Sequence, residues 1–127
     1  MEIKNFEHLL CVGKSVLNNT YDYIQKLFFR NEMCLYEYTC EGKTDKGLEV
    51  IIDDIVLVCI FNNGNCKKSI LYFSKPDDII DCIRYCDENY DHDKKEKTWE
   101  LPNSYLTLYF PDDNTGRFGF VQTLIKL

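Results

Sequence analysis

Apolar and polar residues alternate in two stretches of the chain that repeat each other. Four positions of the first stretch recur 58 residues later, so that Leu48, Val50, Ile52 and Asp54 correspond to Leu106, Leu108, Phe110 and Asp112. Alternation with a period of two is typical of a strand with one buried face. Each stretch follows a helix-like segment, ends in acidic residues and leads into a second apolar stretch. The pattern predicts two tandem units of helix plus hairpin, over residues 5–74 and 75–127.

The first unit begins with apolar residues at helical spacing over residues 5–29. Gly13-Lys14-Ser15 interrupts this spacing, so we expect a helix, a break, and a second helix over residues 16–28 capped by Ser15. Strands are expected after it over residues 33–41, 48–53, 55–61 and 69–74. The clearest turn is Asn62-Asn63-Gly64-Asn65, because asparagine and glycine tolerate a positive φ.

The second unit opens at Pro76-Asp77-Asp78, where a proline and acidic residues suit the first turn of a helix. A short edge strand is expected around residues 99–101, and a last hairpin over residues 105–110 and 118–125. Because an isolated hairpin cannot bury its apolar face, the helices must cover it. The predicted fold is α+β, with a single antiparallel sheet of about six or seven strands and helices on one face.

The length of 127 residues and the 45% hydrophobic content predict one domain over residues 1–127 that buries a core without metals or disulfides. The first five residues do not resemble a signal peptide, and no apolar run approaches the length of a membrane span. We therefore expect a cytoplasmic protein with no membrane partner.

Negative charge is concentrated in the second unit. Residues 76–113 contain 11 carboxylates and 4 basic side chains, whereas residues 1–75 contain 10 and 9, and the whole chain carries a formal net charge of −6. Such a chain repels nucleic acid. The acidic stretch favours a basic protein partner, and a merely solvated surface is the alternative interpretation.

Seven cysteines are present, an odd number, and no two have the CxxC spacing of a zinc or redox site. Without a secretory signal, reduced thiols buried as small hydrophobic side chains are expected. We predict no disulfide and no metal ligand.

Candidate catalytic groups have simpler structural explanations. Gly13-Lys14-Ser15 lacks the earlier glycine and buried strand of a phosphate-binding loop. His92 lies in a charged loop, and no serine or cysteine nucleophile can be paired with a histidine by spacing. The pairs Asp53-Asp54 and Asp112-Asp113 fall at hairpin turns, where aspartate is common. The sequence thus predicts no enzyme, no catalytic residue and no cofactor.

The residues expected to bind a partner lie on the acidic helix, the loop after it and the next strand. Carboxylates would steer a basic partner, and interleaved aromatic side chains would anchor it. The predicted partner-binding residues are Asp77, Asp78, Asp81, Tyr85, Asp87, Glu88, Tyr90, Asp91, Asp93 and Trp99.

Residues 105–116, Tyr-Leu-Thr-Leu-Tyr-Phe-Pro-Asp-Asp-Asn-Thr-Gly, followed by Phe118-Gly-Phe-Val121, are similar to the closing hairpin of bacterial immunity proteins. These proteins neutralise polymorphic or contact-dependent growth-inhibition toxins, and many share the small, acidic α+β layout. The tandem units also resemble the repeats of beta-lactamase-inhibitor-like domains. The resemblance to immunity proteins implies a cytoplasmic inhibitor of a toxin, often a cationic nuclease.

The leading functional hypothesis is therefore an immunity protein whose acidic surface binds and occludes a basic toxin domain. The alternative is a small-ligand-binding or regulatory module with a pocket between helix and sheet.

Overall fold

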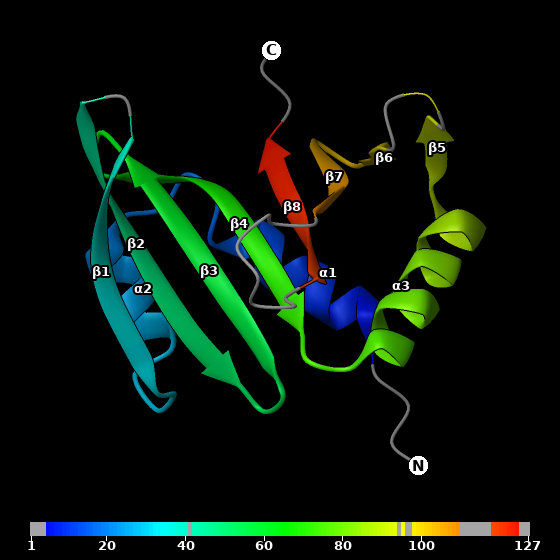
Figure 1. Ribbon diagram of the computed structural model, residues 1–127, viewed down its shortest axis with the longest axis horizontal. Coiled ribbons are helices and arrows are strands. Elements are labelled where there is room, and N and C mark those ends of the chain that lie inside the picture. Colours follow the sequence, from blue (N-terminus) through cyan, green and yellow to red (C-terminus); the bar gives the residue numbers. More distant parts are fainter. Residues whose placement is uncertain (1–4, 41, 94, 96–97, 110–117, 125–127) are drawn as a thin grey trace.

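Eight strands form one antiparallel sheet in the computed structural model, and three helices accompany it (Figure 1). The structure describes residues 5–40, 42–93, 95, 98–109 and 118–124, without the side chains at positions 36, 38–40, 43, 45, 109, 118 and 124. The α+β prediction with a single antiparallel sheet is confirmed, with eight strands in place of six or seven.

The first half of the chain contains two helices and four strands: α1 (Phe6–Ser15), α2 (Tyr21–Leu27), β1 (Met33–Cys40), β2 (Lys43–Ile52), β3 (Ile55–Asn62) and β4 (Asn65–Phe73). The second half contains one helix and four strands: α3 (Pro76–Asn89), β5 (Asp91–Asp93), β6 (Thr98–Leu101), β7 (Ser104–Tyr109) and β8 (Phe118–Leu124). The strand β5 occupies part of the segment that the sequence predicted as a charged loop.

Each half forms a four-stranded meander, and the two halves meet through their last strands. The order across the sheet is β1-β2-β3-β4-β8-β7-β6-β5. By this topology β2 and β3 correspond to β6 and β7. The 58-residue recurrence instead aligned β2 with β7. In the topology, β7 corresponds to β3, so the recurrence matched strands that differ by one position in the two halves. The predicted hairpins do lie in one sheet, and the turn at Asp112 falls outside the described residues.

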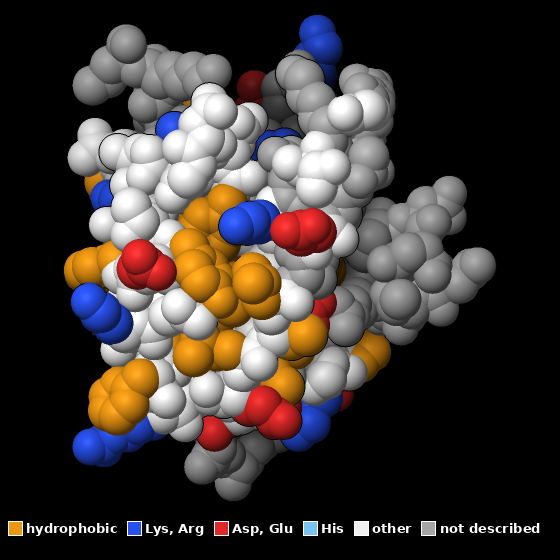
Figure 2. Space-filling model, turned by 90° about the vertical axis from the view of Figure 1, so that its left-hand side faces the viewer, with side chains coloured by type: hydrophobic (Ala, Val, Ile, Leu, Met, Phe, Trp, Pro, Cys, Tyr) orange, Lys and Arg blue, Asp and Glu red, His pale blue; other side chains and the backbone are white. Residues whose placement is uncertain are grey.

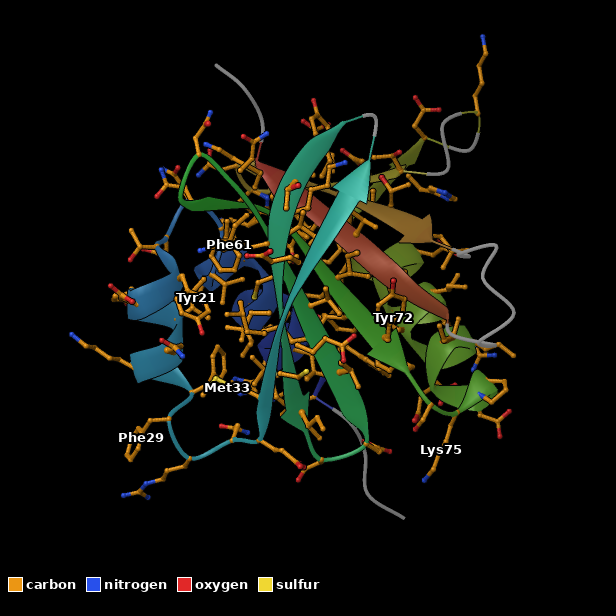
Figure 3. All side chains as sticks on the ribbon, turned by 60° about the vertical axis from the view of Figure 1, so that its left-hand side comes forward. Tyr21, Phe29, Met33, Phe61, Tyr72 and Lys75 are labelled. Carbon is orange, nitrogen blue, oxygen red and sulfur yellow. The ribbon has the colours of Figure 1, made fainter. Side chains whose placement is uncertain are left out.

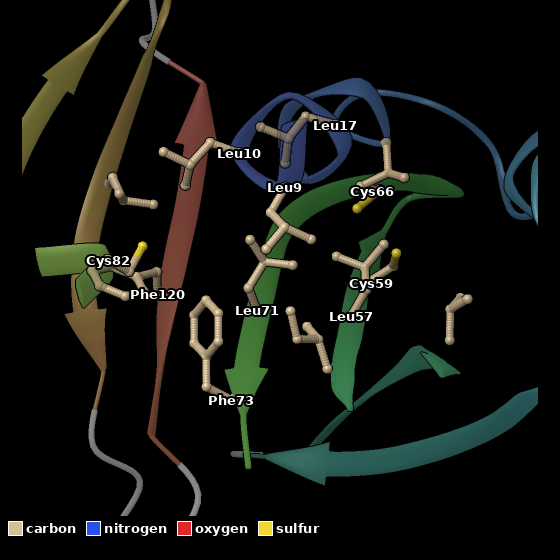
Figure 4. Packing of buried hydrophobic residues seen from close by; sticks show 14 of the residues in the cluster. Leu9, Leu10, Leu17, Leu57, Cys59, Cys66, Leu71, Phe73, Cys82 and Phe120 are labelled. Atoms are coloured by element: carbon tan, nitrogen blue, oxygen red, sulfur yellow. The ribbon is translucent and has the colours of Figure 1, made fainter. Parts of the chain in front are cut away.

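One hydrophobic core lies between the helices and the sheet. Along β3, residues Ile55, Leu57, Cys59 and Phe61 alternate into this core, as period-two patterning requires. The helices add Leu9 and Leu10 from α1, Ile24 from α2, and Ile79, Cys82 and Cys86 from α3. Figure 4 shows side chains of α1 and α3 packed against β3, β4 and β8. Because all three helices contribute to the cluster that this face of β3 lines, they cover the same side of the sheet.

The predicted order of a helix, a break and a second helix is confirmed, but the break lies later than expected. Helix α1 continues through Gly13 to Ser15, and α2 begins at Tyr21 with Thr20, in place of Ser15, as its N-cap. Gly13 is the point where α1 touches the sheet. Its carbonyl accepts a hydrogen bond of 2.6 Å from the Ser69 hydroxyl, and a Cβ at Gly13 would lie 2.8 Å from Gln122 Oε1. The missing side chain permits close packing and does not end the helix.

In the described part of the chain, the opposite face of the sheet carries no helix. Its central rows contain apolar side chains from four strands: Ile51, Val56, Val58, Ile60, Ile70, Tyr72 and Val121. Paired residues of antiparallel strands share a face, so these rows continue on to Thr107 of β7 and Thr98 of β6. The helix-free face therefore changes from apolar at its centre to polar at the β5 end.

Candidate functional site: two acidic hollows beside helix α3

Helix α3 places most of the predicted partner-binding residues. It begins at Pro76 with Asp77 and Asp78 in its first turn, where carboxylates interact favourably with the exposed N–H groups. Ile79, Cys82 and Cys86 turn into the core at helical spacing. The opposite side of α3 exposes Asp77, Asp81, Arg84 and Glu88. The apolar side of α3 therefore faces the core, and its charged side faces solvent.

The first hollow lies on the helix-free face at the β5 end of the sheet and has a volume of about 630 Å³. Two neighbouring cross-strand rows line it. One row runs Asp91, Glu100, Tyr105 and Thr123, and the other runs Asp93, Thr98 and Thr107. Their alternate neighbours, Trp99 and Leu106, point into the core on the other side. The pleat of β5 and β6 thus gathers the carboxylates into one depression, and His92 with residues of β7 and β8 completes the lining.

Carboxylates dominate the chemistry of this first hollow. Asp91, Asp93 and Glu100 are exposed, and no lysine or arginine is among its described lining residues. Asp93 Oδ1 accepts a hydrogen bond of 3.0 Å from the backbone N–H of Lys95. Three carboxylates beside threonine hydroxyls favour a positively charged group, because carboxylate hydrogen bonds to guanidinium or ammonium are the stronger kind.

The second hollow, of about 580 Å³, lies between the start of α1 and α3, on the helix side of the sheet. Its lining residues are Asn5, Phe6, Glu7, Asp81, Arg84, Tyr85 and Glu88. The rings of Phe6 and Tyr85 in this lining pack with their centroids 6.0 Å apart. Tyr90, which lies outside the lining, packs on Tyr85 with a centroid distance of 6.1 Å. Burial, together with a hydrogen bond to Tyr85, raises the pKa of Tyr90 to about 12. Arg84 adds positive charge here and lies 3.9 Å from Asp81 Oδ1.

Trp99 was expected to anchor a partner, and the structure places it in the core instead, only 2% exposed. Its indole N–H donates a hydrogen bond of 2.9 Å to Asp87 Oδ1. The ring of His92 stacks on the indole at a centroid distance of 4.4 Å, and His92 Nδ1 lies 3.3 Å from the same Asp87 oxygen. The contacts among Trp99, Asp87 and His92 therefore link the end of α3 to β6. Because the indole ring is buried, neither of its faces is open to a partner.

The remaining predicted residues divide between separate places. Asp81, Tyr85 and Glu88 line the second hollow, and Asp91 and Asp93 line the first. Because the hollows lie on opposite sides of the sheet, the acidic segment does not form one continuous surface. Asp77, Asp78 and Tyr90 are not among the lining residues of either hollow.

Sequence reasoning missed several residues of the first hollow: Glu100, Thr98, Tyr105, Thr107 and Thr123. A signal for two of them was present, since an edge strand that buries Trp99 and Leu101 must expose Thr98 and Glu100 on its other face. The hollow itself required the pairing of β6 with β7 and β8, which one sequence does not reveal.

Neither hollow lies between helix and sheet, where the alternative small-ligand hypothesis places its pocket; the core cluster lies there. Six described cysteines carry free thiols, and the described residues contain no group of three His, Cys, Asp or Glu side chains suited to a metal ion. Within the described part of the chain, no helix has the length and apolar character needed to cross a membrane.

Comparison of the chain with protein-family models, with curated proteins and with solved structures found no match.

Proposed function

We propose that the protein is an immunity protein that binds and occludes a cationic toxin domain through its acidic half. The observation that carries the proposal is the first hollow, where Asp91, Asp93 and Glu100 converge without a lining lysine or arginine among the described residues. A hollow of about 630 Å³ is large enough to admit basic side chains of a partner. Occlusion by binding requires no catalytic group of the inhibitor itself.

The acidic residues have two different roles in this proposal. The exposed carboxylates of α3, Asp77, Asp81 and Glu88, steer a basic partner during approach. The hollow then receives lysine or arginine side chains, whose charges are paired with carboxylates as water leaves. Tyr105 is 39% exposed at the hollow and supplies an aromatic contact, the role that the sequence had assigned to Trp99.

The opposite placement of the two hollows limits how a partner docks. A rigid, flat partner contacts one hollow, and only a partner that reaches around the β5 edge contacts both. We assign the direct contact to the first hollow because Arg84 offsets part of the negative charge of the second. Substitutions in the first hollow should therefore affect the dissociation rate most.

The test is surface binding of the purified protein to a cationic toxin domain encoded beside its gene. A triple variant, Asp91→Asn, Asp93→Asn and Glu100→Gln, removes the three carboxylates at nearly constant shape. Its matched control, Asp22→Asn, Asp53→Asn and Glu32→Gln, removes the same charge from exposed positions of the first half. We expect the hollow variant to weaken binding at least about 10-fold and the control to change it about 3-fold or less.

Salt dependence separates steering from contact. Screening acts over about 8 Å at physiological ionic strength, so the association rate of the unmodified protein should fall as salt rises. If both triple variants keep the affinity and salt dependence of the unmodified protein while remaining folded, the first hollow is solvated surface and the proposal fails.

A further inference from the structure

The two edges of the sheet are protected very differently. The strand β5 at one edge has three residues, two of them exposed aspartates. The strand β1 at the other edge has eight residues, contains no proline, and pairs with β2 in an unbroken register from Met33↔Val50 to Cys40↔Lys43. Short strands and inward or edge charges prevent sheets from joining, whereas a long regular edge is a template for another strand. The β1 edge is long and regular, and Glu37 is the one charged residue in its sequence.

Exposed hydrophobic side chains gather at the same end of the molecule. Seven large hydrophobic residues are exposed in the described structure, and four belong to α2, the segment after it and β1: Tyr23 at 52%, Leu27 at 48%, Phe29 at 70% and Leu35 at 47%. Figure 2 faces this end and shows hydrophobic side chains across its centre, with single charged side chains around them. In Figure 3 the labelled Phe29 points away from the body of the molecule. A regular edge strand beside this apolar surface has the composition of an interface.

The charge at this end favours a second copy of the chain over a strongly charged partner. The exposed described acids Asp22, Glu32 and Glu37 are balanced by the exposed bases Lys26, Arg30 and Lys46. The excess negative charge lies in residues 76–113, at the opposite end of the sheet. Two copies that meet at β1 therefore keep their acidic halves far apart.

We propose that two copies of the protein associate through their β1 strands, antiparallel about a two-fold axis, so that one sheet continues through both. A strand that pairs antiparallel with its own copy satisfies the self-complementarity of a two-fold interface. An axis at position 36 places Glu37 opposite Leu35 of the second copy, so the two carboxylates do not face each other. Pairing then adds about six to eight main-chain hydrogen bonds. Both acidic halves stay exposed, so the proposal does not depend on the proposed function.

The test is sedimentation of the purified protein from low to high micromolar concentration in the presence of a reductant. The expected result is a mass that rises from one chain to two and no further. Leu35→Glu puts a carboxylate at the centre of the pairing, directly opposite Glu37 of the second copy. It should raise the dissociation constant at least about 10-fold, because like charges opposite each other destabilise a strand pair. The matched control Ile80→Glu changes a similarly exposed residue of α3, 53% exposed, and should leave the dissociation constant unchanged.

Amide hydrogen exchange identifies the surface independently. Residues 33–40 should become more protected as concentration rises, while residues 91–93 should not change. Phe29→Glu, at a 70% exposed position outside the strand, replaces Leu35→Glu if the latter does not fold. Four outcomes would each overturn the proposal. These are a single-chain mass at every concentration, an assembly that grows past two copies, a dimer that needs oxidation, and equal effects of Leu35→Glu and Ile80→Glu.

Discussion

Replacing Asp87 with alanine should destabilise the protein, although Asp87 lies on the surface of α3. The substitution removes the acceptor of the Trp99 indole N–H, a bond of 2.9 Å to Asp87 Oδ1. It also removes the contact of His92 Nδ1 with the same oxygen, at 3.3 Å. Because Trp99 is 2% exposed, its N–H has no ready replacement partner.

The expected cost follows from these exposures. A buried donor left without an acceptor costs about 1–3 kcal/mol. The Asp87 side chain is 50% exposed, so water partly replaces it, and we expect a loss of about 1–2 kcal/mol in the free energy of unfolding. With a urea dependence of about 2 kcal/mol/M for a protein of this size, the midpoint should fall by about 0.5–1 M.

Urea unfolding followed by tryptophan fluorescence measures this change, since Trp99 is the single tryptophan of the chain. The matched control is Asp81→Ala on the same helix, whose carboxylate is 56% exposed and lies 3.9 Å from Arg84 Nη1. An exposed pair of this kind contributes less than about 0.5 kcal/mol. Equal midpoints for Asp87→Ala and Asp81→Ala would refute the idea that Asp87 fastens α3 to β6.

Three further predictions concern packing and thiols. Gly119→Ala should lower the free energy of unfolding in urea by about 2–3 kcal/mol or more, because the added Cβ would collide with the Leu71 carbonyl oxygen where β4 pairs with β8. A variant as stable as the unmodified protein would contradict this pairing. Gly13→Ala should lower the free energy of unfolding by about 1 kcal/mol in the same assay, although alanine has the higher helix propensity, because the added Cβ would press on Gln122. A gain in stability would show that α1 can move away from the sheet. In a Cys40→Ser background, maleimide should label two thiols of the folded protein, Cys11 and Cys34, and should label the other four only in denaturant. Those four thiols are buried, and hydrogen bonding together with burial raises the pKa of both Cys59 and Cys82. Mass spectrometry counts the labels, and fast labelling of all six thiols would contradict the packing.

The elements that sequence patterning predicted well are those whose signals are local. Three such signals are the alternation over residues 48–53, which lie mostly in β2, the Asn62–Asn65 turn before β4, and the proline at the start of α3. Each acts within a few residues. Gly64 has a φ of +83°, the conformation for which glycine was expected there. Local patterning therefore sufficed for the α+β class and the antiparallel sheet.

The errors arose where residues distant in sequence decide the structure. Gly13 looked like a helix break because its packing partners, Ser69 and Gln122, are far along the chain. The Asp91–Asp93 segment looked like a loop because its charges carry no strand signal, yet His92 stacks on Trp99 and holds β5 against β6. The face that Trp99 occupies depends on the pairing of β6 with β7, which the side chain itself does not reveal.

The position of β8 in the middle of the sheet has a consequence for the timing of synthesis. The edge of β4 that β8 covers, with Leu71 and Phe73 in its pairing register, is complete once residue 73 is made, but its partner begins only at residue 118, 45 residues later. At about 5–20 residues per second, that edge waits roughly 2–9 s for its partner. An unpaired strand edge is prone to join other chains during such a delay. The newly made first half is thus the species in which aggregation competes with folding, and synonymous changes that slow translation of residues 74–117 should lower the yield of folded protein.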